Sequence, residues 1–179
     1  MKKIVLILML SAMSMLCYAQ NIVKESTYEI ELTKDALFTK VKMFIVDSWV
    51  NPKNSILNED KENGIIQIKT DSEIAINVGM GLQSVYEYEY RTRIRMKDGK
   101  YKIEFYDVTC TSAEQVGLGN SYDIPEIPYF EGDEPPVKTT KMGKGVPAKK
   151  AVEIMNTLRK EFEVITNKLN EYLTSEDDF

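Results

Sequence analysis

Histidine is absent from this sequence of 179 residues, and cysteine occurs only twice, at Cys17 and Cys110. Histidine is the side chain best suited to proton transfer at neutral pH and is a common zinc ligand. Its absence therefore removes the usual basis of acid–base catalysis and of metal binding. The carboxylate pairs that remain, such as Glu87 with Glu89, are typical of solvated charge on strands and loops. We expect no enzymatic activity, no catalytic residue, no metal and no cofactor.

The sequence also lacks an apolar run long enough to cross a membrane. The longest run, Ile4–Leu16, is shorter than the roughly 20 residues that a spanning helix needs. A basic start precedes it and a small-x-small pattern ending at Ala19 follows it, as in a secretory signal peptide. We predict that residues 1–19 are a signal peptide, cleaved after Ala19, and that the protein is periplasmic or secreted.

Cleavage at that position removes two lysines and changes the formal net charge from −5 to −7. An acidic domain does not suit nucleic acid, whose phosphates need a basic surface. We therefore expect the partner to be an unknown envelope protein or a small ligand. Cys110 is then the last cysteine, which excludes an internal disulfide. Lipid anchoring at Cys17 is an alternative, although Leu16 occupies a position where lipoprotein signals have a small residue.

The next part of the chain predicts a strand followed by a helix. Apolar residues alternate over residues 28–32, as in a half-buried strand. Thr33 is a suitable N-cap, and apolar residues then recur at helical spacing over residues 37–49, until Asn51-Pro52 ends this helix. Trp49 could bind a ligand, but we expect it to be the last core residue of this helix.

Turn signals then predict antiparallel strands. Asn63-Gly64 indicates a hairpin between residues 55–58 and 65–70. Residues 71–84 follow as an irregular or edge-strand connection. Asp98-Gly99 indicates a second hairpin, within the alternating stretch of residues 85–108.

The second hairpin has a predictable register. On one face it pairs Met96 with Tyr101, Ile94 with Ile103, and Thr92 with Phe105. On the other face Arg93 lies opposite Glu104, and Arg91 is placed for a cation–π contact with Tyr106. We expect this second face, including Arg95, to be exposed to water, with mixed charges that do not form a nucleic-acid surface.

A long excursion rich in proline and glycine interrupts the pattern at residues 111–146. Loops of this length are usually functional or disordered. Its apolar side chains are candidates for an interaction surface: Tyr122, Ile127, Tyr129 and Phe130. A cover over a sheet edge is an equally good interpretation.

The chain closes with a long helix and an acidic tail, residues 175–179. Apolar residues step by three or four from Ala148 to Tyr172, which predicts a single helix lying across the sheet, opened by Pro147. The order β-α-β-β-β-β-α then predicts an α+β fold, an antiparallel sheet with both helices packed on one face. We expect one domain over residues 20–174.

The sequence resembles a family of exported bacterial proteins, domain of unknown function 4468, which has a TBP-like fold. The resemblance rests on FIVDSWV, DKENGIIQIK and YRTRIRMKDGKYKIEFYDV, and extends from about Tyr28 to Thr111. These are packing and turn motifs, so the resemblance implies a fold and implies no activity, cofactor or catalytic residue. The comparison with TBP concerns shape and implies no binding of DNA.

These features together predict a non-catalytic module of the cell envelope that binds a protein or a small ligand. A further candidate surface is the end of the second hairpin where the core side turns polar, at Tyr88, Tyr90 and Asp107. These side chains could line a pocket, but we expect them to form hydrogen bonds to a neighbouring loop. The alternative is a carrier of a hydrophobic small molecule in a cavity between sheet and final helix. We predict instead that apolar side chains fill that space: Phe44, Ile94, Phe105, Phe162 and Ile165.

Overall fold

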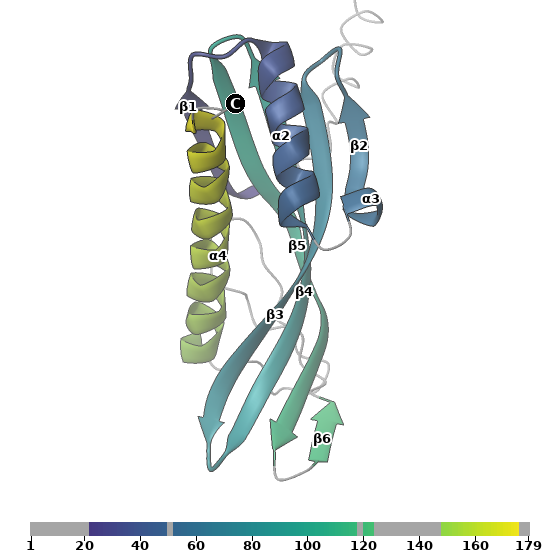
Figure 1. The fold of residues 1–179 in the computed structure, drawn as a ribbon. Helices are drawn as coiled ribbons and strands as arrows, with labels where there is room; N and C mark the ends of the chain where they lie inside the picture. The colour runs from purple at the N-terminus through teal and green to yellow at the C-terminus, as the bar shows by residue number, and fades with distance from the viewer. Residues whose placement is uncertain (1–21, 50–51, 118–119, 124–147, 176–179) are drawn as a thin grey trace, which may run out of the picture.

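The computed structural model describes residues 22–49, 52–117, 120–123 and 148–175. They form one antiparallel sheet with two long helices on one of its faces (Figure 1). The elements are β1 (Ile22–Glu29), α2 (Lys34–Ser48), α3 (Pro52–Ser55), β2 (Ile56–Asp60), β3 (Ile65–Gly79), β4 (Leu82–Lys97), β5 (Lys100–Gly117), β6 (Asn120–Asp123) and α4 (Ala148–Thr174). The strand order is β1-β5-β4-β3-β2, and β6 pairs with β5.

The predicted fold class and element order are confirmed, with α3 and β6 added. The predicted signal peptide, Cys17, Pro147 and most of the acidic tail lie outside the described residues.

The first helix begins and ends close to the predicted residues. The Thr33 hydroxyl accepts a hydrogen bond from the Ala36 N–H at 3.3 Å, which confirms the N-cap, and α2 ends at Ser48. The preceding strand differs from the prediction because β1 starts at Ile22 and ends at Glu29. Ile30 and Leu32 therefore lie beyond the strand, where they still pack partly buried against the core.

The hairpin at Asp98-Gly99 has the predicted register, from Met96 opposite Tyr101 to Arg91 opposite Tyr106. Beyond Tyr106 the register shifts, and Asp107 has a positive φ of 52°. This is a β-bulge, in which an extra residue on one strand turns the following side chains to the other face. Val108 and Cys110 consequently join the core.

The prediction for residues 71–84 is corrected by the structure. They are not irregular: β3 continues to Gly79, the chain turns at Met80 and Gly81, and β4 begins at Leu82. Asp71, Ser72 and Glu73 are poor strand formers, but pairing with β4 and burial of the isoleucines that follow override that preference. The excursion also starts later than predicted, since β5 runs to Gly117 and β6 follows at residues 120–123.

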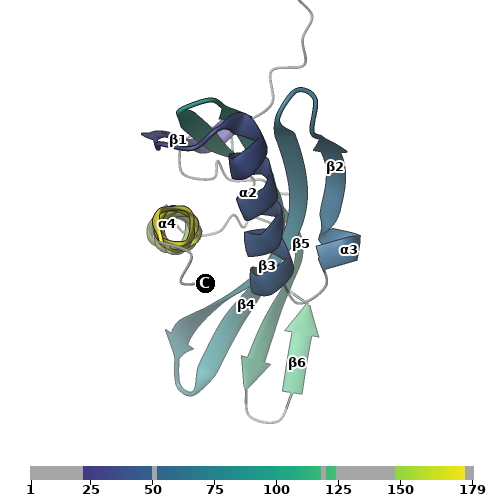
Figure 2. The same ribbon diagram turned by 45° about the horizontal axis from the view of Figure 1, so that its top comes forward.

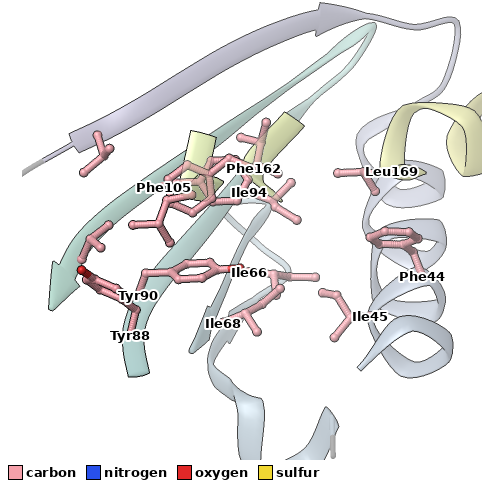
Figure 3. Packing of buried hydrophobic residues seen from close by; sticks show 14 of the residues in the cluster. Phe44, Ile45, Ile66, Ile68, Tyr88, Tyr90, Ile94, Phe105, Phe162 and Leu169 are labelled. Carbon is pink, nitrogen blue, oxygen red and sulfur yellow. The ribbon is translucent and has the colours of Figure 1, made fainter. Parts of the chain in front are cut away.

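The core lies between the sheet and the two helices, and α4 crosses the same face of the sheet as α2 (Figure 2). Phe162 of α4 is fully buried and stacks on Phe105 with ring centroids 4.4 Å apart. Tyr90 meets Phe162 edge-on at 5.0 Å (Figure 3). Phe44 and Ile94 are buried members of the same core cluster, and Ile165 packs against it partly buried. Phe105 and Phe162 fill the centre of the space beneath α4, as predicted, whereas Phe44 and Ile165 also line an open groove at its side.

The face away from the helices is not uniformly exposed, which corrects the sequence interpretation. Glu104 is only 2% exposed and Arg93 only 9%, and the Arg93 Nε donates to Glu104 Oε2 at 2.5 Å. Arg95 Nε and Lys102 Nζ also contact the Glu104 carboxylate, at 3.3 and 3.2 Å. The three cations that contact the Glu104 carboxylate offset the cost of burying its charge. The cation above the Tyr106 ring is Arg93, at 5.0 Å, rather than the predicted Arg91.

Gly64 and Gly99 both lie in turns and both have a positive φ, but they differ in how closely other atoms approach them. Gly99 has φ 77° and an added Cβ would meet nothing within 4 Å, whereas at Gly64, with φ 65°, it would lie 2.5 Å from the Met96 carbonyl oxygen. We expect Gly99→Ala to lower the free energy of unfolding by about 1–2 kcal/mol, from backbone strain alone. Gly64→Ala should lower it by about 3 kcal/mol or more, because the overlap adds to the strain. Denaturant unfolding measures both, and equal losses would contradict the close approach of Gly64 to β4.

The lowered pKa of the Glu104 carboxyl predicts how the free energy of unfolding depends on pH. Burial disfavours its ionised form, but the hydrogen bonds from Arg93 and Lys102 prevail and hold the pKa of the carboxyl below its ordinary value of 4.5. The unfolded state then binds more protons in this range, so the stabilisation is present above the ordinary pKa and is lost as the pH falls through the folded-state pKa. Glu104→Gln should reduce the free energy of unfolding by about 2 kcal/mol at neutral pH. That difference from wild type should shrink in acid.

The matched control is Glu25→Gln, since Glu25 contacts the same Lys102 at 2.7 Å from an exposed position. We expect a much smaller effect from this change, because exposed ion pairs contribute little. A difference between wild type and Glu104→Gln that stays constant from neutral to acidic pH would show that the ionised carboxylate does not stabilise the fold.

Candidate functional site

An open groove of 440 Å³ lies where the C-terminal end of α2 meets α4 and strands β3 and β4. Its apolar lining comes from both helices: Phe44, Trp49, Val164 and Ile165. Thr70 and Tyr90 contribute from the strands, and the charged side chains that line it are Glu161 and Lys168. A volume of this size, mostly apolar with a few placed polar groups, is typical of small-ligand sites.

Trp49 fixes one wall of the groove. The helix α2 ends beside it, since the Trp49 backbone N–H donates to the Ile45 carbonyl at 3.0 Å. Its ring meets Phe44 edge-on with centroids 6.0 Å apart, and its indole N–H donates to the Thr70 hydroxyl at 3.3 Å. Trp49 is partly buried against the core, as predicted, and it also lines the groove.

Glu161 is the most firmly held polar group of the groove. Its two carboxylate oxygens accept hydrogen bonds from the hydroxyls of Ser72, at 2.6 Å, and of Tyr90, at 2.7 Å. Burial, and to a lesser degree the neighbouring Glu161, raise the pKa of Tyr90 well above its ordinary value. Tyr90 therefore remains a protonated donor, and the carboxylate can still accept from a further donor because its oxygens offer about four acceptor positions.

The structure separates the sequence-predicted corner of Tyr88, Tyr90 and Asp107. Tyr88 and Tyr90 are 1% and 0% exposed on the helix-covered face. The bulge instead places the Asp107 carboxylate 3.8 Å from Arg91, on the opposite face. Only Tyr90 of the three lines the groove beside Trp49.

The candidates in the excursion are described only in part. Tyr122 belongs to β6, opposite Gln115 of β5. Ile127, Tyr129 and Phe130 lie outside the described residues, so their role stays a prediction.

Sequence reasoning missed the α4 side of the groove. Glu161 bonds to Tyr90 and Ser72 across 71 and 89 residues of chain, a pairing that no local pattern encodes. Val164 does leave a signal in the sequence, because it is an apolar residue beside the apolar stripe of α4. In the structure its side chain is 51% exposed.

Cys110 is a free and buried thiol, as predicted, and burial raises the pKa of Cys110 to about 11, so it is protonated and unsuited to nucleophilic attack. Within the described ranges, no three Asp, Glu or Cys side chains lie close enough together to hold a metal ion. None of the helices in those ranges is both long and apolar enough to cross a membrane.

Known proteins share this architecture. Residues 25–111 match the family described as a domain of unknown function (DUF4468) with TBP-like fold. A crystal structure of a DUF4468 family protein from Bacteroides ovatus ATCC 8483 aligns with a TM-score of 0.57 at 10% sequence identity, covering 87% of this chain and 88% of that one. A TBP-like protein from Parabacteroides distasonis ATCC 8503 gives 0.49 at 17% identity, with 86% and 93% covered.

Curated proteins gave no match to the chain. The likeness to the Bacteroides protein concerns the fold, because the sequence identity is low. The match of residues 25–111 and the shared fold agree with the resemblance carried by the turn and packing motifs. Over residues 25–111 the chain is therefore similar to the DUF4468 family, described as a domain of unknown function with TBP-like fold.

Proposed function

We propose that this protein is a non-catalytic binding module of the cell envelope and that the groove beside Trp49 is its binding site. The observation that carries the proposal is the combination of apolar walls with the fixed cluster of Glu161, Tyr90 and Ser72. Such sites bind through apolar contact and use a few positioned polar groups to orient the ligand. The location in the envelope rests on the signal-peptide pattern of residues 1–19.

The chemistry of the groove favours binding over catalysis. Glu161 is bonded to two neutral hydroxyl donors, and the hydroxyl of Tyr90 stays protonated at any ordinary pH. A nucleophile needs an adjacent base to remove its proton, and histidine, the usual base, does not occur in the chain. The buried thiol of Cys110 does not line the groove.

The packing also distinguishes a surface site from an enclosed carrier cavity. Phe105 and Phe162 are in stacking contact at the centre of the layer beneath α4, where a carrier would hold its ligand. Space of ligand size is found at the side of this layer, in the open groove. This favours a ligand that lies in the groove over a hydrophobic molecule enclosed under the helix.

Two other hollows, of 500 and 530 Å³, flank the outer surface of α2. Their apolar side chains, such as Met43, Val46 and Leu57, are about half exposed. We prefer the groove beside Trp49 because a positioned carboxylate and a buried tyrosine hydroxyl lie in it.

Trp49 is the only tryptophan in the chain, so its fluorescence reports on the groove without a label. We expect the neutral apolar dye N-phenylnaphthylamine to bind the full chain and to change Trp49 emission. Val164→Arg should weaken dye binding about tenfold or more, because it places a charge in the apolar wall.

The matched control is Val152→Arg, on the same helix but outside the groove and similarly exposed, at 43% against 51%. This change should leave dye binding as it is in the wild type. The proposal fails if the dye does not alter Trp49 emission, or if the two arginine variants bind the dye equally well.

A further inference from the structure

The groove carries opposite charges at positions spaced along one helix. Glu161 and Lys168 both line it, and both belong to α4, two helical turns apart. Seven residues of α-helix rise about 10.5 Å. Val164 and Ile165 line the groove between them, so an apolar wall connects an acid to a base.

Each charge is available to a ligand. The hydrogen-bond partners of Glu161, Ser72 and Tyr90, are neutral, so they orient the carboxylate without cancelling its charge. Lys168 is exposed, and among the described residues it forms no hydrogen bond or ion pair. An ammonium group with three donors suits the first position, and a carboxylate suits the second.

These features match a short peptide with free ends. An extended chain advances about 3.3–3.6 Å per residue, so three residues span about 10 Å, close to the spacing of the two charges. We infer that the groove binds tripeptides with apolar side chains, the terminal ammonium at Glu161 and the terminal carboxylate at Lys168. The side chains then lie against Phe44, Trp49 and Val164. This inference rests on the proposed function, because it names the ligand of the same groove.

The two charges also determine which end of the peptide lies at which residue, and how long the peptide is. The reversed peptide would place its carboxylate against Glu161 and its ammonium against Lys168. A single amino acid can reach only one of the two positions. An uncharged apolar molecule would use the walls and gain nothing from either end. Dependence on free peptide termini is therefore the property that separates this ligand class from other apolar ligands.

The experiment uses the full chain and trileucine, followed by Trp49 fluorescence. We expect trileucine with free ends to bind about tenfold more tightly than its N-acetylated form and about tenfold more tightly than its C-amidated form. Each modification removes one charge-assisted contact. The neutral dye is titrated in parallel to test the groove itself.

Two variants assign each terminus to its residue. Glu161→Gln should abolish the preference for a free ammonium while the preference for a free carboxylate remains. Lys168→Met should do the reverse. Lys160→Met, on the same helix and outside the groove, should leave both preferences unchanged. Unfolding curves check that each variant is folded.

The outcomes separate the two proposals. If the dye binds in the groove but trileucine does not bind, or binds equally well with free and blocked ends, the peptide inference is overturned and the proposed function stands. If neither the dye nor trileucine affects Trp49, both are overturned. Preferences that survive in Glu161→Gln and Lys168→Met would also overturn the inference.

Discussion

The contact of Phe162 with the sheet determines where the groove residues lie. Its ring is fully buried, stacked on Phe105 and edge-on to Tyr90. Burying an aromatic side chain of this kind contributes about 2–3 kcal/mol, with about 1 kcal/mol more from the ring geometry. Because successive residues of a helix are rotated by about 100°, fixing Phe162 also fixes Glu161 beside Tyr90 and Ser72. The rotation of α4 thus places the carboxylate and, further along, Val164 and Lys168.

The two faces of the sheet are stabilised by different means. The helix-covered face is apolar, while on the other face three cations surround the buried carboxylate of Glu104. Arg91 pairs with Asp107 at the bulge, and Lys69 with Glu89. These basic residues are engaged with acids of the same sheet. Together with the acidic net charge of the chain, this keeps our expectation that the face binds no polyanion, which stays a prediction.

Features governed by neighbouring residues could be predicted from the sequence. The Asp98-Gly99 turn determined the register as far as Arg91 and Tyr106, and the hydroxyl of Thr33 marked the start of α2. The apolar stripe of α4 predicted that it lies across the sheet as a single helix.

Features that depend on distant contacts could not be predicted in this way. Asp107 adopts a positive φ without being glycine, so the bulge has no sequence signal. The bulge turns the Asp107 carboxylate toward Arg91 and away from Tyr88 and Tyr90, so the predicted corner does not form. Arg93 alternates like an exposed residue, and its burial follows only from the neighbours that cover it. The partners of Glu161 lie on β3 and β4, so the groove was visible only in three dimensions.

We propose that a ligand binds between the end of α2 and α4. The most direct measurement is a map of backbone amide NMR shifts for the full chain on addition of trileucine. We expect the largest shifts to cluster at Ser48, Trp49 and Thr70 and along residues 161–168, with the indole N–H of Trp49 among them. Shifts concentrated instead around Met43, Val46 and Leu57, or at the exposed Met80 turn, would contradict it.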